Sequence, residues 1–227
     1  MVVIATMVMH ANTTTGAFYV INPGNIKLKL DASVISSNQF QNGSYASNMA
    51  GWATLCWFGT VSTSTQTWSL ELTNNTTVGF LAYGMIAAFT VTDGAFLDTA
   101  SVALTANTQV TVANMTTTLQ GDVVAIGIAS VRDNSTSNSV YAANAVVLQR
   151  DNAYDIGNQV SWLVEYNTSF ASGPTYPFFR VDANVTNPSY QIKMTAPRTN
   201  QYGEAKIVAF STVLVEEKTV TDSISLS

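Results

Sequence analysis

The chain has 227 residues, of which 47% are apolar and 10% are charged, whereas roughly 25% of residues are charged in ordinary soluble domains. With a net charge of −5 and nine scattered Lys and Arg residues, it has no basic patch for a phosphate backbone, which excludes nucleic acid as an expected partner. Its single cysteine, Cys56, excludes an intramolecular disulfide and a multi-cysteine metal site, and we expect it to be a small buried hydrophobe.

Thr, Ser and Asn supply 70 residues and take the place of charged residues as the source of polar surface. This composition favours strands and turns over helix interiors. Apolar runs alternate with turn clusters such as Asn42-Gly43-Ser44, Thr92-Asp93-Gly94 and Asn187-Pro188-Ser189. The strands predicted from this pattern lie, in chain order, near residues 2–9, 16–21, 25–35, 52–60, 66–73, 78–92, 108–112, 121–132, 139–149, 158–166, 176–183, 189–195 and 204–216.

The periodicity within these runs predicts how each strand is covered. In residues 26–30 the apolar side chains share one face and Lys27 and Lys29 the other, as expected of a half-buried strand with solvated lysines. Residues 123–128 and 207–214 are apolar on both faces and are expected to be central strands. We therefore predict an all-β fold, an Ig-like or pilin-like β-sandwich over residues 16–227, with room for an additional sheet. No apolar run reaches the length of a spanning helix, so we expect no integral membrane segment.

Acceptor sequons of the form Asn-x-Ser/Thr are unusually frequent. This composition would yield about four by chance, and most of those present fall in polar clusters where loops are expected. They indicate export and covalently attached N-glycans on an extracellular protein. The predicted glycosylation sites are Asn12, Asn42, Asn74, Asn75, Asn114, Asn134, Asn167 and Asn184.

The beginning of the chain is almost wholly apolar. It lacks the charged leader of a secretory signal, and its β-branched residues and shortness argue against a pilin-type helix. It is then a strand that is buried either in the chain's own sheet or, as a donor strand, in that of a neighbouring copy. We assign residues 1–15 to the donor strand and a threonine-rich spacer. The predicted donor residues form one face (Val3, Ala5, Met7, Met9) and a less buried opposite face (Val2, Ile4, Thr6, Val8), with His10 near the end.

A short apolar N-terminal strand followed by a sequon-rich body of low charge resembles the subunits of archaeal threads and bundling pili. The resemblance extends over the whole chain in composition and layout. It implies a homopolymeric cell-surface filament in which the tail of each subunit completes the sheet of the next by donor-strand complementation, for adhesion or biofilm formation. The alternative is a surface-lattice or virion coat protein whose apolar N-terminal strand packs at a symmetric interface.

Catalytic chemistry finds little support in the sequence, and we expect neither an enzyme nor a cofactor. The single histidine, His10, lies in the apolar tail, away from any nucleophile and acid pattern. Asp151 and Asp155 lack the glycine and glutamate of a calcium loop, and no spacing suits zinc, so no metal site is predicted. Lys206 lies between Ala205 and Ile207, which are both expected to be buried, and this makes it a candidate for condensation with an Asn or Asp side chain.

Overall fold

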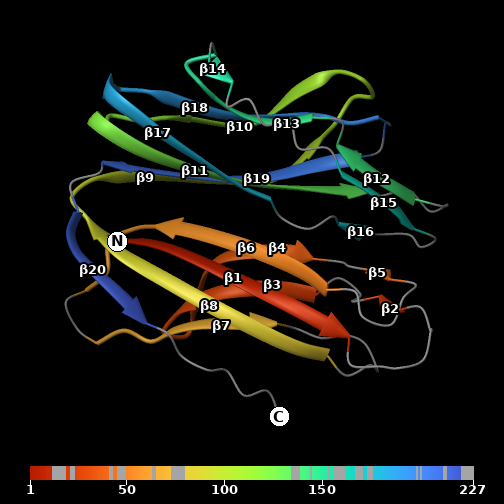
Figure 1. Ribbon diagram of the computed structural model, residues 1–227, viewed down its shortest axis with the longest axis horizontal. Coiled ribbons are helices and arrows are strands. Elements are labelled where there is room, and N and C mark those ends of the chain that lie inside the picture. Colours follow the sequence, from red (N-terminus) through yellow and green to blue (C-terminus); the bar gives the residue numbers. More distant parts are fainter. Residues whose placement is uncertain are drawn as a thin grey trace.

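The computed structural model describes most of the chain as a layered β structure (Figure 1). The described residues are 1–11, 19–20, 24–40, 43–44, 50–62, 65–72, 80–133, 139–143, 145–152, 154–155, 162–166, 171–172, 176–197, 199, 201–211 and 214–220.

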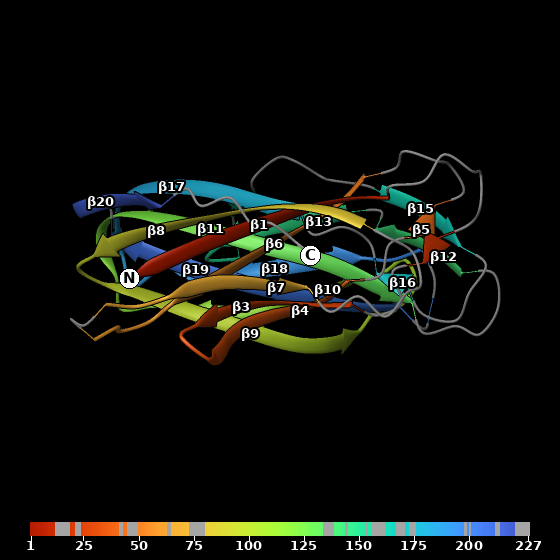
Figure 2. The ribbon, with the colours of Figure 1, turned by 90° about the horizontal axis from the view of Figure 1, so that it is seen from below.

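Four sheets are stacked face to face, and two small two-stranded sheets flank them (Figures 1 and 2). The first sheet contains, in spatial order, β4 (Ser33–Phe40), β3 (Gly24–Leu30) and β7 (Trp68–Leu72). The second sheet contains β20 (Leu214–Val220), β8 (Phe80–Val91), β1 (Val2–Ala11) and β6 (Ala50–Phe58). The third sheet contains β16 (Ala171–Ser172), β11 (Gln120–Asp133), β19 (Gln201–Ser211) and β9 (Gly94–Ala103), and β17 (Tyr176–Thr186) also pairs with β11. The fourth sheet contains β10 (Gln109–Thr116), β18 (Ser189–Thr195), β13 (Ala145–Arg150) and β14 (Tyr154–Asp155). The small sheets pair β2 (Tyr19–Val20) with β5 (Gly43–Ser44), and β12 (Ser139–Ala143) with β15 (Trp162–Tyr166).

Three apolar cores separate the four layers. The first core lies between the first and second sheets and contains Ile26, Leu28 and Leu55. The second core joins the second and third sheets through Cys56, Ile128 and Val208, among others. The third core, between the third and fourth sheets, is the largest. The second and third sheets are therefore apolar on both faces, because each is covered from both sides.

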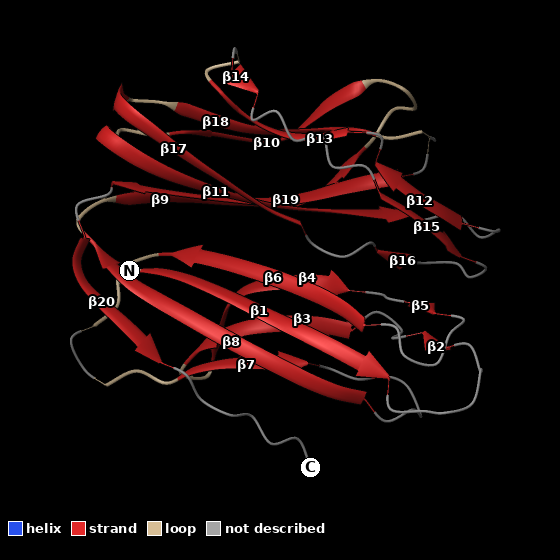
Figure 3. Cartoon of the chain, in the orientation of Figure 1, coloured by secondary structure: helices blue, strands red, loops and turns tan. Residues whose placement is uncertain are grey.

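The sandwich prediction is confirmed, and so is the central position of the two strands that are apolar on both faces. All regular elements in the described ranges are strands, and none is a helix (Figure 3). β11 and β19 are neighbours inside the third sheet. A helix long and apolar enough to cross a membrane is not found among the residues that the structure describes.

The strand predicted over residues 25–35 is a hairpin instead. β3 and β4 are joined at Asp31, whose φ of 54° lies in the left-handed region that Asp tolerates in turns. The Asp31 carboxylate accepts a 2.9 Å hydrogen bond from the Thr67 amide, and the Asp31 amide donates to the Thr67 carbonyl at 2.7 Å. The turn contains neither glycine nor proline, and for this reason it was not predicted from the sequence. Lys27 and Lys29 are half-buried rather than solvated, because both donate to Glu71 on the neighbouring strand β7.

Several further predictions of elements were wrong. β9 was missed, although it follows directly after the predicted turn at residues 92–94. The strands predicted over 139–149 and 204–216 are each two strands, and β19 and β20 even belong to different sheets. The turn predicted at residues 42–44 includes β5. In each case the deciding contact is with a strand far away in sequence, which local periodicity does not report.

Candidate subunit interface at the N-terminal strand

β1 is an inner strand of the second sheet, with antiparallel partners on both sides (Figure 1). Met7, for example, lies opposite Ala53 of β6 and Gly84 of β8. At the start of the strand, the Met1 amino group donates to the Gly59 carbonyl at 2.9 Å, and the Gly59 amide donates back to the Met1 carbonyl at 3.2 Å. We call the space between β6 and β8 that β1 fills the β1 slot.

The two faces of β1 differ in burial as their alternation predicts. Val3, Ala5 and Met7 point into the first core and are at most 3% exposed. On the opposite face burial decreases along the strand, from Val2, which is fully buried in the second core, to Val8, which is 39% exposed. Ile4 and Thr6 between them are half-buried, and the Thr6 hydroxyl lies 3.3 Å from that of Thr54. The backbones of Met9 and His10 continue the pairing; their side chains are outside the described part.

Neither neighbour of β1 is connected to it by a hairpin. β1 ends at Ala11, whereas β6 begins at Ala50 and β8 at Phe80. Between β1 and its two neighbours, the contacts are therefore side-chain packing and sheet hydrogen bonds, with no short connection from one strand to the next. An identical strand from another copy would find the same partners in the same register. In the single chain β1 fills its own sheet, which is the ordinary first-strand arrangement, and donation to a neighbour stays a prediction.

An exposed apolar surface adjoins the open end of the β1 slot. Val8 lies directly opposite Tyr83, and both are exposed, as is Met85 two residues further along β8. The exposed fractions of Tyr83 and Met85 are 65% and 59%. Phe179 and Val181 on the edge strand β17 are exposed as well. Neighbouring exposed apolar side chains such as those of Val8 and Tyr83 are typical of interaction sites.

Two of the eight predicted glycosylation sites belong to the described residues. Asn114 on β10 and Asn184 on β17 are both exposed, so a glycan at either position would meet solvent. The Asn114 amide oxygen accepts a 3.2 Å hydrogen bond from Gln191. Asn184 has a φ of 53°, and its backbone N–H donates a hydrogen bond to the Asp122 carboxylate at 2.9 Å. The other six, Asn12, Asn42, Asn74, Asn75, Asn134 and Asn167, lie outside the described residues.

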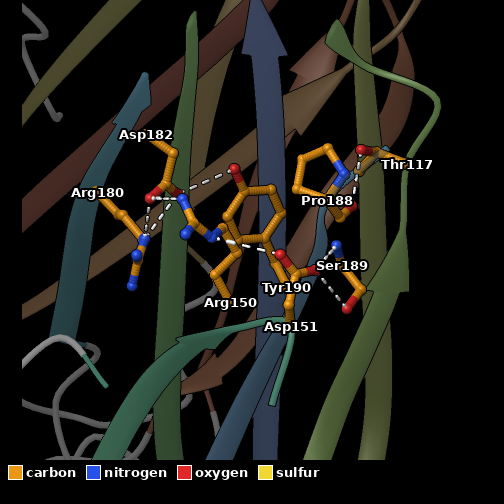
Figure 4. Close-up of polar contacts among 8 residues, drawn as sticks. All are labelled: Thr117, Arg150, Asp151, Arg180, Asp182, Pro188, Ser189 and Tyr190. Atoms are coloured by element: carbon orange, nitrogen blue, oxygen red, sulfur yellow. Dashed lines mark hydrogen bonds and ion pairs between the residues drawn. The ribbon is translucent and has the colours of Figure 1, made fainter. Parts of the chain in front are cut away.

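A cluster of buried ionic groups fastens the edge strand β17 to the fourth sheet (Figure 4). The Asp182 carboxylate is almost fully buried and accepts hydrogen bonds from Arg150 Nη1 at 2.6 Å, from Arg180 Nε at 2.6 Å and from the Tyr190 hydroxyl at 3.2 Å. Burial, followed by the adjacent Asp182 carboxylate, raises the pKa of the Tyr190 phenol. The charges compensate one another, and we assign the cluster a structural role.

A second, partly buried polar contact lies on the face of the third sheet that packs against the second. Lys206 on β19 donates to the Asp98 carboxylate on β9 at 2.5 Å. The two residues face each other in register. Cys56 is fully buried in the adjoining core, as predicted, and burial raises the pKa of its thiol to about 12, while the nearby charges of Lys206 and Asp98 act in opposite directions.

The acidic residues considered for calcium have other partners. Asp151 accepts hydrogen bonds from the Ser189 amide and hydroxyl and forms an ion pair with Arg150 (Figure 4). The side chain of Asp155 lies outside the described part. No group of three or more potential metal ligands occurs in the described ranges. Two tryptophans, Trp57 and Trp68, pack against the first core with their ring centroids 5.8 Å apart.

No family model and no curated protein matches this chain. Among solved structures, the chain is similar to the structure of the infectious bursal disease virus Gx strain, with 11% sequence identity and a TM-score of 0.31. A crystal structure of the infectious bursal disease virus VP2 subviral particle is similar with 9% identity and a TM-score of 0.30. Each alignment covers 92% of this chain and 56% of the other, so the chain spans little more than half of these proteins. At such TM-scores the similarity carries no argument about function.

Proposed function

We propose that this chain is a structural subunit of an extracellular, N-glycosylated filament, and that it polymerises head to tail by donor-strand complementation. The β1 strand of one subunit leaves its own sheet and fills the β1 slot of the next. A heterologous contact of this kind generates an open filament when the rotation between successive subunits does not close into a ring. Such an assembly suits adhesion or biofilm formation at a cell surface.

The observation that carries the proposal is the combination of burial and connectivity in β1. The strand buries Val3, Ala5 and Met7 between two partners, yet it is linked to neither by a hairpin. An apolar strand that contributes this much to a core without a hairpin to either neighbour is the kind of element exchanged in domain swapping. The strand can thus move to an equivalent slot without untying any other pair of strands.

Two further features support an extracellular assembly. The sequons exceed chance, and the two that are described, Asn114 and Asn184, are accessible to a glycan. The exposed pair Val8 and Tyr83 marks the mouth of the slot, where the body of a donating subunit would come to lie. Apolar side chains at that position give the incoming subunit a surface to cover.

A disulfide between Val8→Cys and Tyr83→Cys tests the proposal directly. The two positions are opposite in register, at a spacing within reach of a disulfide after small adjustments. After oxidation of assembled protein, donation predicts a ladder of covalent oligomers on a non-reducing gel. Cys56 can be left in place because it is fully buried.

The single variants Val8→Cys and Tyr83→Cys serve as controls and should form no ladder, whereas a mixture of the two should stop at dimers. If filaments seen by electron microscopy yield only internally bridged monomers, β1 is not donated. Closed shells or flat lattices in the micrographs would instead favour the coat-protein alternative, since those arise from rotational contacts.

A further inference from the structure

The contact between Lys206 and Asp98 joins a lysine buried in a sheet interface to a carboxylate on the next strand. The Lys206 side chain is 8% exposed and that of Asp98 37% exposed, with Nζ 2.5 Å from Oδ1. Lysine is rarely buried to this extent unless it is paired. The strands hold the two residues directly opposite each other, so their side chains share one face of the third sheet.

The lysine end of the pair is buried beside the second core, whereas the carboxylate end is partly exposed. Lys206 lines a small hollow with Ile128, Ser130 and Glu204. Ile128 and Val208 on the same face belong to the second core, which excludes water from the lysine side. Asp98 reaches the surface with its outer part, which gives a released water molecule a way out.

From this arrangement we propose that Lys206 and Asp98 become joined by an isopeptide bond. The proton of the ammonium group that lies on Oδ1 passes to the carboxylate, which leaves an amine beside a carboxylic acid. Nζ then attacks Cγ, an N–C bond forms, one C–O bond breaks and one water molecule leaves with the second amine proton. No oxidant or other reactant takes part, since an ammonium and a carboxylate give an amide and water.

Two ordinary side chains can condense in this way because the fold holds the reacting groups in contact. Groups held in contact react as if at very high concentration, because the entropy of bringing them together has been lost already in folding. Glu204 in the same hollow offers a carboxyl group that can relay protons during the reaction.

The bond would close a large loop of the chain. Asp98 and Lys206 are 108 positions apart, and the segment between them contains β10 and β18 of the fourth sheet. It would also fix β9, the edge strand of the third sheet, to its neighbour β19. A subunit pulled along the chain could then not extend between these residues. The inference does not rest on strand donation and can fail or hold independently of it.

Intact mass spectrometry of the full chain, produced in a host without N-glycosylation, tests the bond. We expect the protein to be lighter than its calculated mass by one water molecule. Fragmentation of a digest should give a branched peptide that joins the segments carrying Asp98 and Lys206. A wild-type protein of full calculated mass, or a water loss located elsewhere, would overturn the inference and leave an ion pair.

Two variants and a matched control sharpen the measurement. Lys206→Arg keeps a positive charge but removes the amine, and Asp98→Ala removes the acceptor carbon, so both should have their full calculated masses. Lys193→Arg, at a half-buried lysine on β18, should lose water as the wild type does. If Lys206→Arg also lost water, the assignment to this pair would be wrong.

Discussion

Substituting Asp for Met7 should destabilise the protein far more than the same change one position later at Val8. Met7 is 3% exposed and packs in the first core, whereas Val8 is 39% exposed on the other face of the same strand. In both variants the backbone and its sheet pairing are unchanged, so the comparison isolates the burial of the side chain. Val8→Asp is therefore a closely matched control.

The magnitude follows from what the new carboxylate would meet. At Met7 it would be a buried charge with no partner, which costs about 3–5 kcal/mol, a large part of the roughly 5–15 kcal/mol that stabilises a domain. For a chain of this size about 1 kcal/mol shifts the Tm by about 2–4 °C, so Met7→Asp should lower it by about 6–20 °C. At Val8 the carboxylate reaches water, and we expect a loss of at most about 1 kcal/mol from reduced strand propensity.

Urea unfolding followed by tryptophan fluorescence measures this difference, because Trp57 and Trp68 pack against the same core as Met7. Assembly should be lost in Met7→Asp for the same reason, since the charge meets the same core in a neighbour's slot. Equal destabilisation by Val8→Asp would mean that the faces of β1 are wrongly assigned. An unchanged midpoint for Met7→Asp would mean that β1 is not buried in this slot at all.

Three other outcomes are expected. Peptide mass spectrometry of the natively produced protein should find N-glycans at the exposed Asn114 and Asn184; bare asparagine at both would remove support for export. Cys56 should resist alkylation until the chain unfolds, and because its pKa is raised to about 12 from 9.0, its contribution to stability should be complete below pH 9 and decline as the pH rises toward 12. Asp182→Ala should lower the free energy of unfolding by about 1–3 kcal/mol, because two partly buried guanidinium groups and the buried Tyr190 hydroxyl lose their acceptor, and urea denaturation measures this loss.

The sequence predicted those parts of the fold whose periodicity is set by burial. Strands that are apolar on one face, such as β7 and β18, or on both, such as β11, appeared where the pattern placed them. What it did not reveal depends on contacts between distant residues. The turn at Asp31 is stabilised by a hydrogen bond from Thr67, and the assignment of β19 and β20 to different sheets depends on β8 and β11.

The candidate interface was predictable in part for the same reason. The apolar start of the chain required burial, and its alternation correctly separated Ala5 and Met7 from the more exposed Val8. The sequence did not show which strands pair with β1, because β6 and β8 are far from β1 in the chain and come next to it only in the folded sheet. The partner of Lys206 was hidden likewise, since Asp98 lies on the strand that local pattern missed.

The inner position of β1 has a consequence for how subunits would assemble. Removing it would leave two unpaired sheet edges and open both adjoining cores, because Val3 and Val2 belong to different ones. An empty slot is therefore much less stable than a filled one, whether its strand comes from the same chain or from a neighbour.

Because the contacts inside the slot are identical in the two cases, they favour neither the monomer nor the filament. If the subunits polymerise as proposed, the driving force would come from contacts made outside the slot, and the exposed Tyr83 and Met85 offer an apolar surface for them. The rate of polymerisation would be limited by the release of β1 from its own sheet.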